Sequence, residues 1–137
     1  GQVIYQGART RYMTRDEAEP RIKEIYEELN EDGDDEARQK FRMFQEKIYN
    51  FINTQNRIIS GLVEIARRDG IERALTDELE VTRRILPTHN EVLEYVVGEM
   101  LLQNFVLAQN RQIPGKYVVQ MMDGIYSAMQ KMLDLNQ

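Results

Sequence analysis

A twelve-residue segment that occurs twice constrains this chain more than any other feature. Residues 50–61 and 104–115 both begin with Asn-Phe, contain Gln-Asn-Arg and end with glycine. The match continues without a gap at the same offset of 54 residues, so that eleven of 26 positions between residues 50 and 75 are identical. Unrelated sequences would share about one or two such positions. We infer an internal duplication, which bounds the architecture before any other pattern is considered.

Apolar residues recur at helical spacing through both copies, and turn residues divide each copy into two helices. In the first copy we expect a turn at Ser60-Gly61 between helices over about 37–57 and 61–86. In the second copy Pro114-Gly115 marks the corresponding turn after a helix over about 89–111, because proline cannot continue a helix. This third helix is the most apolar, so we expect it at the buried centre.

These elements predict an all-α fold, a four-helix up-down bundle made from two tandem-duplicated helical hairpins. The hairpins cover residues 37–86 and 88–135 of a bundle that spans residues 37–137. An extended basic arm over residues 1–13 precedes the bundle, followed by a short helix and an acidic loop over residues 14–36. A pseudo-twofold axis between the hairpins would bring both Gln-Asn-Arg turns to the same end of the bundle.

The formal net charge of −5 is unevenly distributed along the chain. Residues 1–15 carry three arginines and no acid, whereas residues 16–36 carry eleven acidic and two basic side chains. Residues 37–137 are close to neutral. A basic arm and a near-neutral body therefore flank one acidic segment, and this asymmetry says more about partners than the total charge does.

The composition argues against most kinds of catalytic site. The chain has no cysteine and one histidine, His89, so it cannot form a disulfide or an ordinary zinc site. No nucleophile motif surrounds Ser60 or Ser127, and no phosphate-loop glycine pattern occurs. The acidic residues 30–36 lack the glycine and glutamate that a calcium loop requires. We therefore expect no enzyme activity, no cofactor, no metal ion and no small-molecule substrate.

The outer face of the predicted 37–57 helix carries basic, amide and aromatic side chains within a sector of about 80°. They are Arg38, Arg42, Gln45, Tyr49, Asn53 and Asn56. Bases and amides along a helix suit the phosphate backbone of a nucleic acid, although an ordinary solvated face can have the same composition. The basic N-terminal residues Arg9, Arg11 and Arg15 favour nucleic acid, because arm and helix face together could embrace a duplex.

The repeated Gln-Asn-Arg segments have two interpretations. Gln55-Asn56-Arg57 and Gln109-Asn110-Arg111 each stand at the predicted end of a helix. An arginine there complements the unpaired carbonyl groups of the last turn. The other interpretation is a pair of polar turns that bind an anion or another subunit. Repetition alone does not distinguish the two, because duplicated helix caps and duplicated sites look alike.

The segment before the bundle has its own helical signals. Thr14 to Glu17 fits a capping box, and the apolar residues up to Leu29 have helical spacing. This stretch is similar to the N-terminal segment of carboxymuconolactone-decarboxylase-like proteins. The peroxidase-type members of that family use a pair of cysteines and a nearby histidine. Because this chain has no cysteine, the resemblance implies no such activity.

The predicted arrangement of an N-terminal arm, a short helix and a compact helical bundle resembles the coat proteins of filamentous archaeal DNA viruses. In that family, paired subunits enclose the duplex, with arm and helix surfaces facing it. The resemblance implies contacts to the duplex backbone from Arg9, Arg11, Arg15, Arg38 and Arg42. This chain departs from the family in being less basic, and its acidic segment would face solvent or a basic partner subunit.

Our leading hypothesis is a non-enzymatic structural subunit, similar to a virion coat protein, that assembles with itself or a homologous subunit and coats duplex DNA. The expected nucleic-acid-binding residues are Arg9, Arg11, Arg15, Arg38, Arg42, Tyr49, Asn53 and Asn56. No apolar run approaches 18 residues and no signal-peptide core is present, so we expect no membrane span and a virion or cytoplasmic location.

Two alternatives remain open from the sequence. The first is a soluble helical adaptor that binds a protein partner through its last helix, which is rich in methionine. The methionines of that helix are Met121, Met122, Met129 and Met132. The second is a small helical subunit of a nucleic-acid-guided complex, which would have a fixed stoichiometry with other subunits instead of open-ended assembly.

Overall fold

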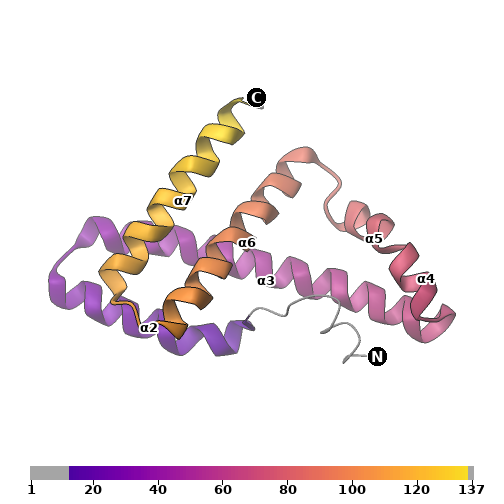
Figure 1. Ribbon diagram of the computed structural model, residues 1–137, viewed down its shortest axis with the longest axis horizontal. Helices are drawn as coiled ribbons and strands as arrows, with labels where there is room; N and C mark the ends of the chain where they lie inside the picture. The colour runs from indigo at the N-terminus through magenta and orange to yellow at the C-terminus, as the bar shows by residue number, and fades with distance from the viewer. Residues whose placement is uncertain (1–12, 136–137) are drawn as a thin grey trace.

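The computed structural model describes residues 13–135, except for the side chains of residues 132, 133 and 135. The described residues form six helices and no strand (Figure 1), so the predicted all-α class is confirmed. The helices are α2 (Arg15–Asp32), α3 (Asp35–Asp69), α4 (Ile71–Thr76), α5 (Glu78–Ile85), α6 (His89–Asn110) and α7 (Gly115–Leu135). The predicted basic arm lies outside the described residues except for Met13.

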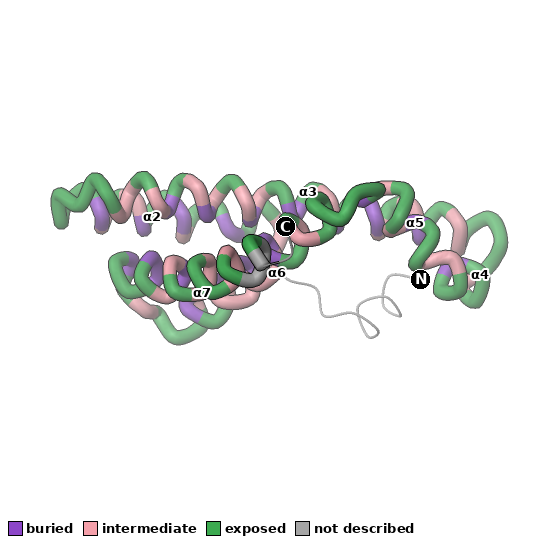
Figure 2. Tube along the Cα trace, turned by 90° about the horizontal axis from the view of Figure 1, so that it is seen from above, coloured by how far each residue is buried: buried purple, intermediate pink, exposed green. Residues whose placement is uncertain are grey.

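Four of the helices form two crossed layers. α2 and α3 run antiparallel in the first layer, and α6 and α7 cross it as a second layer (Figures 1 and 2). The chain reverses between α2 and α3 within two residues. Gly33 adopts the left-handed conformation with φ 67°, and the Asp34 side chain accepts a hydrogen bond from the Ala37 N–H at 3.0 Å. The loop is therefore shorter than the predicted range of residues 30–36, and most of the acidic residues in that range belong to helices.

The main hydrophobic core lies between the two layers and takes side chains from all four helices. Its buried members are Ala18, Ile22, Ile25 and Leu29 of α2, Phe41, Phe44, Ile48, Phe51 and Ile52 of α3, Val97, Leu101, Leu102, Phe105 and Ala108 of α6, and Val118, Val119 and Met122 of α7. The short helix that was predicted before the bundle therefore contributes to the main core. Its apolar stripe is buried against the other three helices.

The two layers touch most closely where α6 crosses α3. A Cβ atom on Gly98 of α6 would lie 2.7 Å from the Lys47 backbone oxygen and 2.7 Å from the Phe51 Cβ, both on α3. These distances are shorter than any carbon atom tolerates without displacing the backbone. The glycine therefore sets how near the two helices lie, and the rest of the core packs at that separation.

A second, smaller core lies at the far end of α3. There α4 and α5 fold back onto the helix (Figure 1), and the buried side chains are Ile58, Leu62, Val81 and Leu86. Gly61 permits this contact, since a Cβ atom at that position would lie 3.1 Å from Val81 Cγ1. Tyr95 of α6 packs against both cores and links them.

The predicted turn at Ser60-Gly61 is wrong, because α3, a helix of 35 residues, continues through it to Asp69. The chain reverses only at Gly70, where φ is 97° and ψ is 161°, a conformation that favours glycine. Serine has the backbone N–H that a continuing helix requires, whereas the proline at the equivalent position of the second copy lacks it. The predicted hairpin of helices over 37–57 and 61–86 therefore does not form.

The second copy does turn where the sequence predicts. α6 ends at Asn110, Arg111 is its C-cap residue, and α7 begins at Gly115, directly after Pro114. Gly124, which aligns with Gly70, lies inside α7. The two copies of one sequence thus break at different points. The aligned glycines 61 and 115 nevertheless both lie where two helices pack closely. A Cβ atom at position 115 would lie 3.2 Å from an Ile25 methyl group, much as one at position 61 would lie 3.1 Å from Val81.

We expect Gly98→Ala to destabilise the fold, because the added carbon meets backbone atoms of α3; overpacking of this kind costs about 1–3 kcal/mol. Gly124→Ala is the matched control. Gly124 is exposed inside α7 with no atom within 4 Å of an added Cβ. That variant should gain about 0.5–1 kcal/mol, because alanine favours a helix interior over glycine. Urea unfolding of both variants gives the comparison. Equal stability of Gly98→Ala and the parent chain would contradict the close crossing.

Candidate nucleic-acid interface

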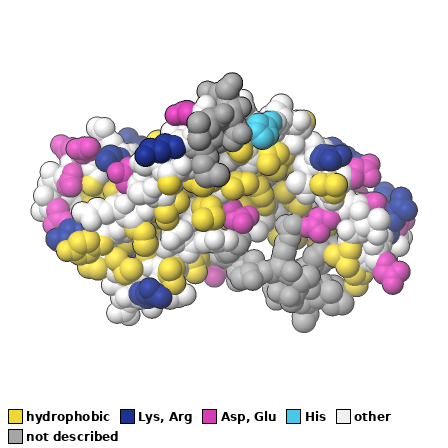
Figure 3. All heavy atoms as spheres, turned by 45° about the horizontal axis from the view of Figure 1, so that its top comes forward, with side chains coloured by type: hydrophobic (Ala, Val, Ile, Leu, Met, Phe, Trp, Pro, Cys, Tyr) yellow, Lys and Arg dark blue, Asp and Glu magenta, His cyan; other side chains and the backbone are white. Residues whose placement is uncertain are grey.

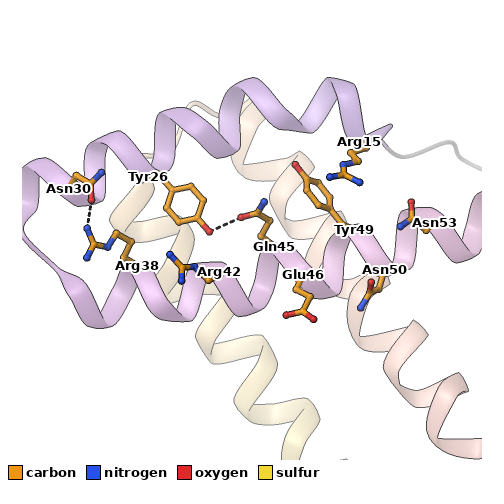
Figure 4. Close-up of a pocket in the computed structure, with 10 residues that line it drawn as sticks. All are labelled: Arg15, Tyr26, Asn30, Arg38, Arg42, Gln45, Glu46, Tyr49, Asn50 and Asn53. Carbon is orange, nitrogen blue, oxygen red and sulfur yellow. Dashed lines mark hydrogen bonds between the residues drawn. The ribbon is translucent and has the colours of Figure 1, made fainter.

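A groove with a volume of about 900 Å³ runs between α2 and the N-terminal half of α3 (Figure 4). The figure shows its side chains in front of the two helices, with α6 and α7 behind. Its lining is rich in guanidinium, amide and phenol groups. The lining residues are Arg15, Tyr26, Asn30, Arg38, Arg42, Gln45, Glu46, Tyr49, Asn50 and Asn53.

The groove gathers most of the nucleic-acid-binding residues predicted from the sequence. Those that line it are Arg15, Arg38, Arg42, Tyr49 and Asn53. Asn56 is exposed further along α3, beyond the groove lining, and Arg9 and Arg11 lie outside the described residues. Sequence reasoning missed the α2 wall, formed by Tyr26 and Asn30, because nothing in the local pattern shows which helix lies beside α3.

Tyr26 joins the two walls of the groove. Its hydroxyl donates a hydrogen bond to Gln45 Oε1 at 2.6 Å, and its ring meets the Phe41 ring edge-on at 5.1 Å. Burial raises the pKa of Tyr26 above its ordinary value, with the Arg42 guanidinium acting in the opposite direction. The phenol therefore stays neutral at physiological pH and holds α2 in register with α3.

Tyr49 supports the arginine at the other end of the groove. The Arg15 guanidinium lies 4.6 Å from the centre of the Tyr49 ring, a distance at which a cation is attracted to the ring face. Burial raises the pKa of Tyr49, the Glu19 carboxylate adds to this effect, and Arg15 opposes it. Arg15 itself is the first residue of α2, directly after the N-cap residue Thr14, which forms a capping box with Glu17.

The other two arginines of the groove differ in how far their charge is compensated. Arg38 pairs with Asp35 at 2.5 Å and donates a second hydrogen bond to Asn30 Oδ1. Arg42 forms no ion pair within the described residues. Glu46 is the carboxylate among the lining side chains, and Asp35 already compensates Arg38, so three guanidinium groups meet two acids. The groove therefore has a local positive charge in a chain that is negative overall.

The two Gln-Asn-Arg segments are not equivalent in the structure. Gln55 is 9% exposed in the middle of α3, so the prediction that this copy ends a helix is wrong. The second copy does end α6, and its turn is held to α2 by Arg21, whose Nη2 donates to the Ile113 carbonyl. Gln109 Oε1 is buried there without a hydrogen-bond partner among the described residues. The predicted pair of like turns at one end of the bundle is therefore not formed.

No described helix is long and apolar enough to cross a membrane. No group of three or more histidine, aspartate or glutamate side chains that could hold a metal ion occurs within residues 13–135. Comparison of the chain with protein-family models, with curated proteins and with solved structures finds no match.

The two groove tyrosines make stability depend on pH. Their raised pKa values mean that the folded state holds the phenolic protons more tightly than the unfolded chain. This contribution is complete below the unfolded pKa of about 10 and is lost as pH rises through the folded value. We expect the double variant Tyr26→Phe, Tyr49→Phe to lose less of its unfolding free energy above pH of about 10 than the parent chain.

Urea unfolding at increasing pH tests this expectation. Tyr117→Phe is the control, because it removes a hydroxyl from α7, outside the groove, where the side chain is 49% exposed. The interpretation fails if the double variant and the parent chain lose stability in parallel.

Proposed function

We propose that this protein is a non-enzymatic structural subunit that self-assembles and coats duplex nucleic acid, with one phosphate backbone lying along the α2–α3 groove. The observation that carries the proposal is the convergence of Arg15, Arg38 and Arg42 on one groove that contains a single carboxylate. Planar guanidinium groups match the geometry of phosphate oxygens better than lysine does. The amides and phenols between them supply the neutral donors that position a backbone.

The length of the groove limits what one subunit can do. From Arg38 to Asn53 the helix rises about 23 Å, at about 1.5 Å per residue. That distance matches about seven base pairs along one strand. The three arginines of the groove, two on this stretch and one on α2, would give a slope of about −3 in a plot of log affinity against log salt concentration. One subunit therefore binds weakly, and stable coating requires several joined subunits, as in a coat.

Because the chain is negative overall, its binding to nucleic acid would depend on the charge of the groove. A chain with a net charge of −5 is not attracted to nucleic acid as a whole, so binding depends on the local field of the groove. The acidic residues of α2 are partly neutralised within the protein. Arg21 pairs with Glu24 and Glu28, both at 3.0 Å.

The adaptor hypothesis has less support than the groove. It requires methionines of the last helix to form a free surface. Met122 is fully buried, and Met121 and Met129 pack against the main core. These side chains fill the space between α7 and its neighbours, so they are not available as a binding face.

Two substitutions in the groove with opposite effects on charge test the proposal. Arg42→Gln should weaken binding to a short duplex and reduce the salt slope by about one, because it removes one phosphate contact. Glu46→Gln should strengthen binding, because it removes a negative charge from the lining of the groove. Fluorescence anisotropy at several salt concentrations measures both effects.

Arg83→Gln is the matched control for the loss of one charge. Arg83 is exposed on α5 at the other end of the molecule and forms no ion pair within the described residues. Its substitution should leave the salt slope unchanged. If Arg42→Gln and Arg83→Gln have the same effect, the groove is not the interface.

Light scattering with long duplex DNA tests the assembly separately. It distinguishes open-ended particles, which the proposal expects, from a complex of fixed stoichiometry.

A further inference from the structure

A pocket with a volume of about 310 Å³ lies between the middle of α3 and the start of α6. Its walls come from α3, from the end of α5 with the residue after it, and from the first turns of α6. The lining residues are Lys47, Asn50, Phe51, Thr54, Arg57, Ile85, Leu86, Asn90, Glu91, Glu94 and Tyr95. A concave site of this size, with apolar walls and a few converging polar groups, is the usual form of a ligand pocket.

The apolar lining of the pocket belongs to both hydrophobic cores. Phe51 is a member of the main core, and its ring lies 4.7 Å from the ring of Tyr95. Leu86 is a member of the second core. Hydrophobic side chains also gather beside His89, the residue directly before Asn90 (Figure 3). Because the two cores hold these side chains in place, the pocket keeps an apolar surface that suits a flat ring.

Arg57 supplies the charge that the pocket can offer to a ligand. Two other charged lining residues, Lys47 and Glu94, pair with each other at 2.8 Å. Glu91 accepts a hydrogen bond from the Thr88 hydroxyl at 2.9 Å at the start of α6. Arg57 is exposed and forms no ion pair within the described residues. A guanidinium group of this kind beside an apolar pocket favours an anion, and its planar shape matches a phosphate.

Helix capping does not account for Arg57. It belongs to the first Gln-Asn-Arg segment of the repeat, in the interior of α3, where the backbone carbonyl groups are bonded within the helix. The aligned Arg111 is the C-cap residue of α6, where a cation complements unpaired carbonyl groups. The first copy also has Thr54 where the second has Ala108. The two copies thus differ in role, since one ends a helix and the other lines a pocket.

Two amide side chains stand on different walls of the pocket, Asn50 on α3 and Asn90 on α6. Neither side chain forms a hydrogen bond within the described residues. An amide both donates and accepts hydrogen bonds, as the polar edge of a nucleobase does. Asn50 also lines the α2–α3 groove (Figure 4), so the pocket adjoins the surface along which the phosphate backbone is proposed to lie.

We propose that this pocket binds one nucleotide with an unpaired base, which lies on the apolar lining between the two amides while its phosphate contacts Arg57. A base inside a duplex is stacked and paired, so only a base at a strand end or in a gap can enter without cost. For a nucleotide within a strand, the inference rests on the proposed function and adds a preference for unpaired ends. A free nucleotide has the same chemistry, and the experiments distinguish the two sources.

Fluorescence anisotropy with three related probes tests the strand. The probes are a blunt duplex, the same duplex with a single-stranded overhang, and that duplex with an overhang of abasic sites. The normal overhang should bind about tenfold more tightly than the abasic one, a gain in the range expected for one bound base. Equal affinity for the two overhangs would overturn binding of a strand base, because phosphates alone would then account for the contact.

Two variants connect the effect to the pocket. Arg57→Gln should weaken binding of the overhang and leave binding of the blunt duplex unchanged. Asn90→Ala should reduce the difference between normal and abasic overhangs. Arg111→Gln is the matched control, because it removes the same charge at the aligned position of the repeat, outside the pocket. If Arg57→Gln and Arg111→Gln weaken binding of the overhang equally, the pocket is not the site.

Calorimetry with adenosine monophosphate separates the two sources. Binding that Arg57→Gln weakens, without any preference for the overhang, would support the pocket and assign it to a free nucleotide. Binding of the monophosphate without binding of any duplex would refute the proposed function and leave the pocket standing. Binding of the blunt duplex, with no effect of the overhang and no binding of the monophosphate, would overturn the pocket and leave the proposed function standing.

Discussion

The crossing of α6 over α3 at Gly98 is the contact on which the rest of the structure depends. Lys47 takes part in it twice. Its backbone oxygen lies against Gly98, and its Nζ pairs with Glu94 of α6 at 2.8 Å. The same ammonium group lies 5.5 Å from the centre of the Tyr126 ring of α7. One stretch of α3 therefore fixes the position of both helices of the second layer, and the main core packs around it.

The same stretch of α3 also positions the groove. Gln45, Glu46 and Tyr49 lie within four residues of Lys47, on another side of the helix, where they face α2 and solvent. Because the core holds their backbone, and Gln45 is also bonded to Tyr26, the amide and phenol groups are already positioned, which reduces the entropy lost on binding.

The sequence predicted the helical class, a helix over about 89–111, a last helix after Pro114-Gly115, and the polar face of α3, because these depend on periodicity within one element. It failed where tertiary contacts decide. Gly61 inside a helix costs about 1 kcal/mol relative to alanine, but it allows Val81 to pack closely and Ser60 leaves the hydrogen-bond ladder intact. The repeat misled for the same reason. The triplet Asp-Gly-Ile marks the end of α3 at residues 69–71, whereas the same triplet lies inside α7 at residues 123–125. The α2 wall, with Tyr26, could not be predicted because pairing between helices leaves no local pattern.

The most direct test of the central claim is an NMR titration of the arginine side-chain Nε–Hε signals with a short DNA duplex. If the groove binds a phosphate backbone, the signals of Arg15, Arg38 and Arg42 should shift together and return as salt is added. Arg67, Arg68 and Arg83, at the other end of the molecule, should stay unchanged. Shifts confined to that second group, or no shift at low salt, would contradict the claim.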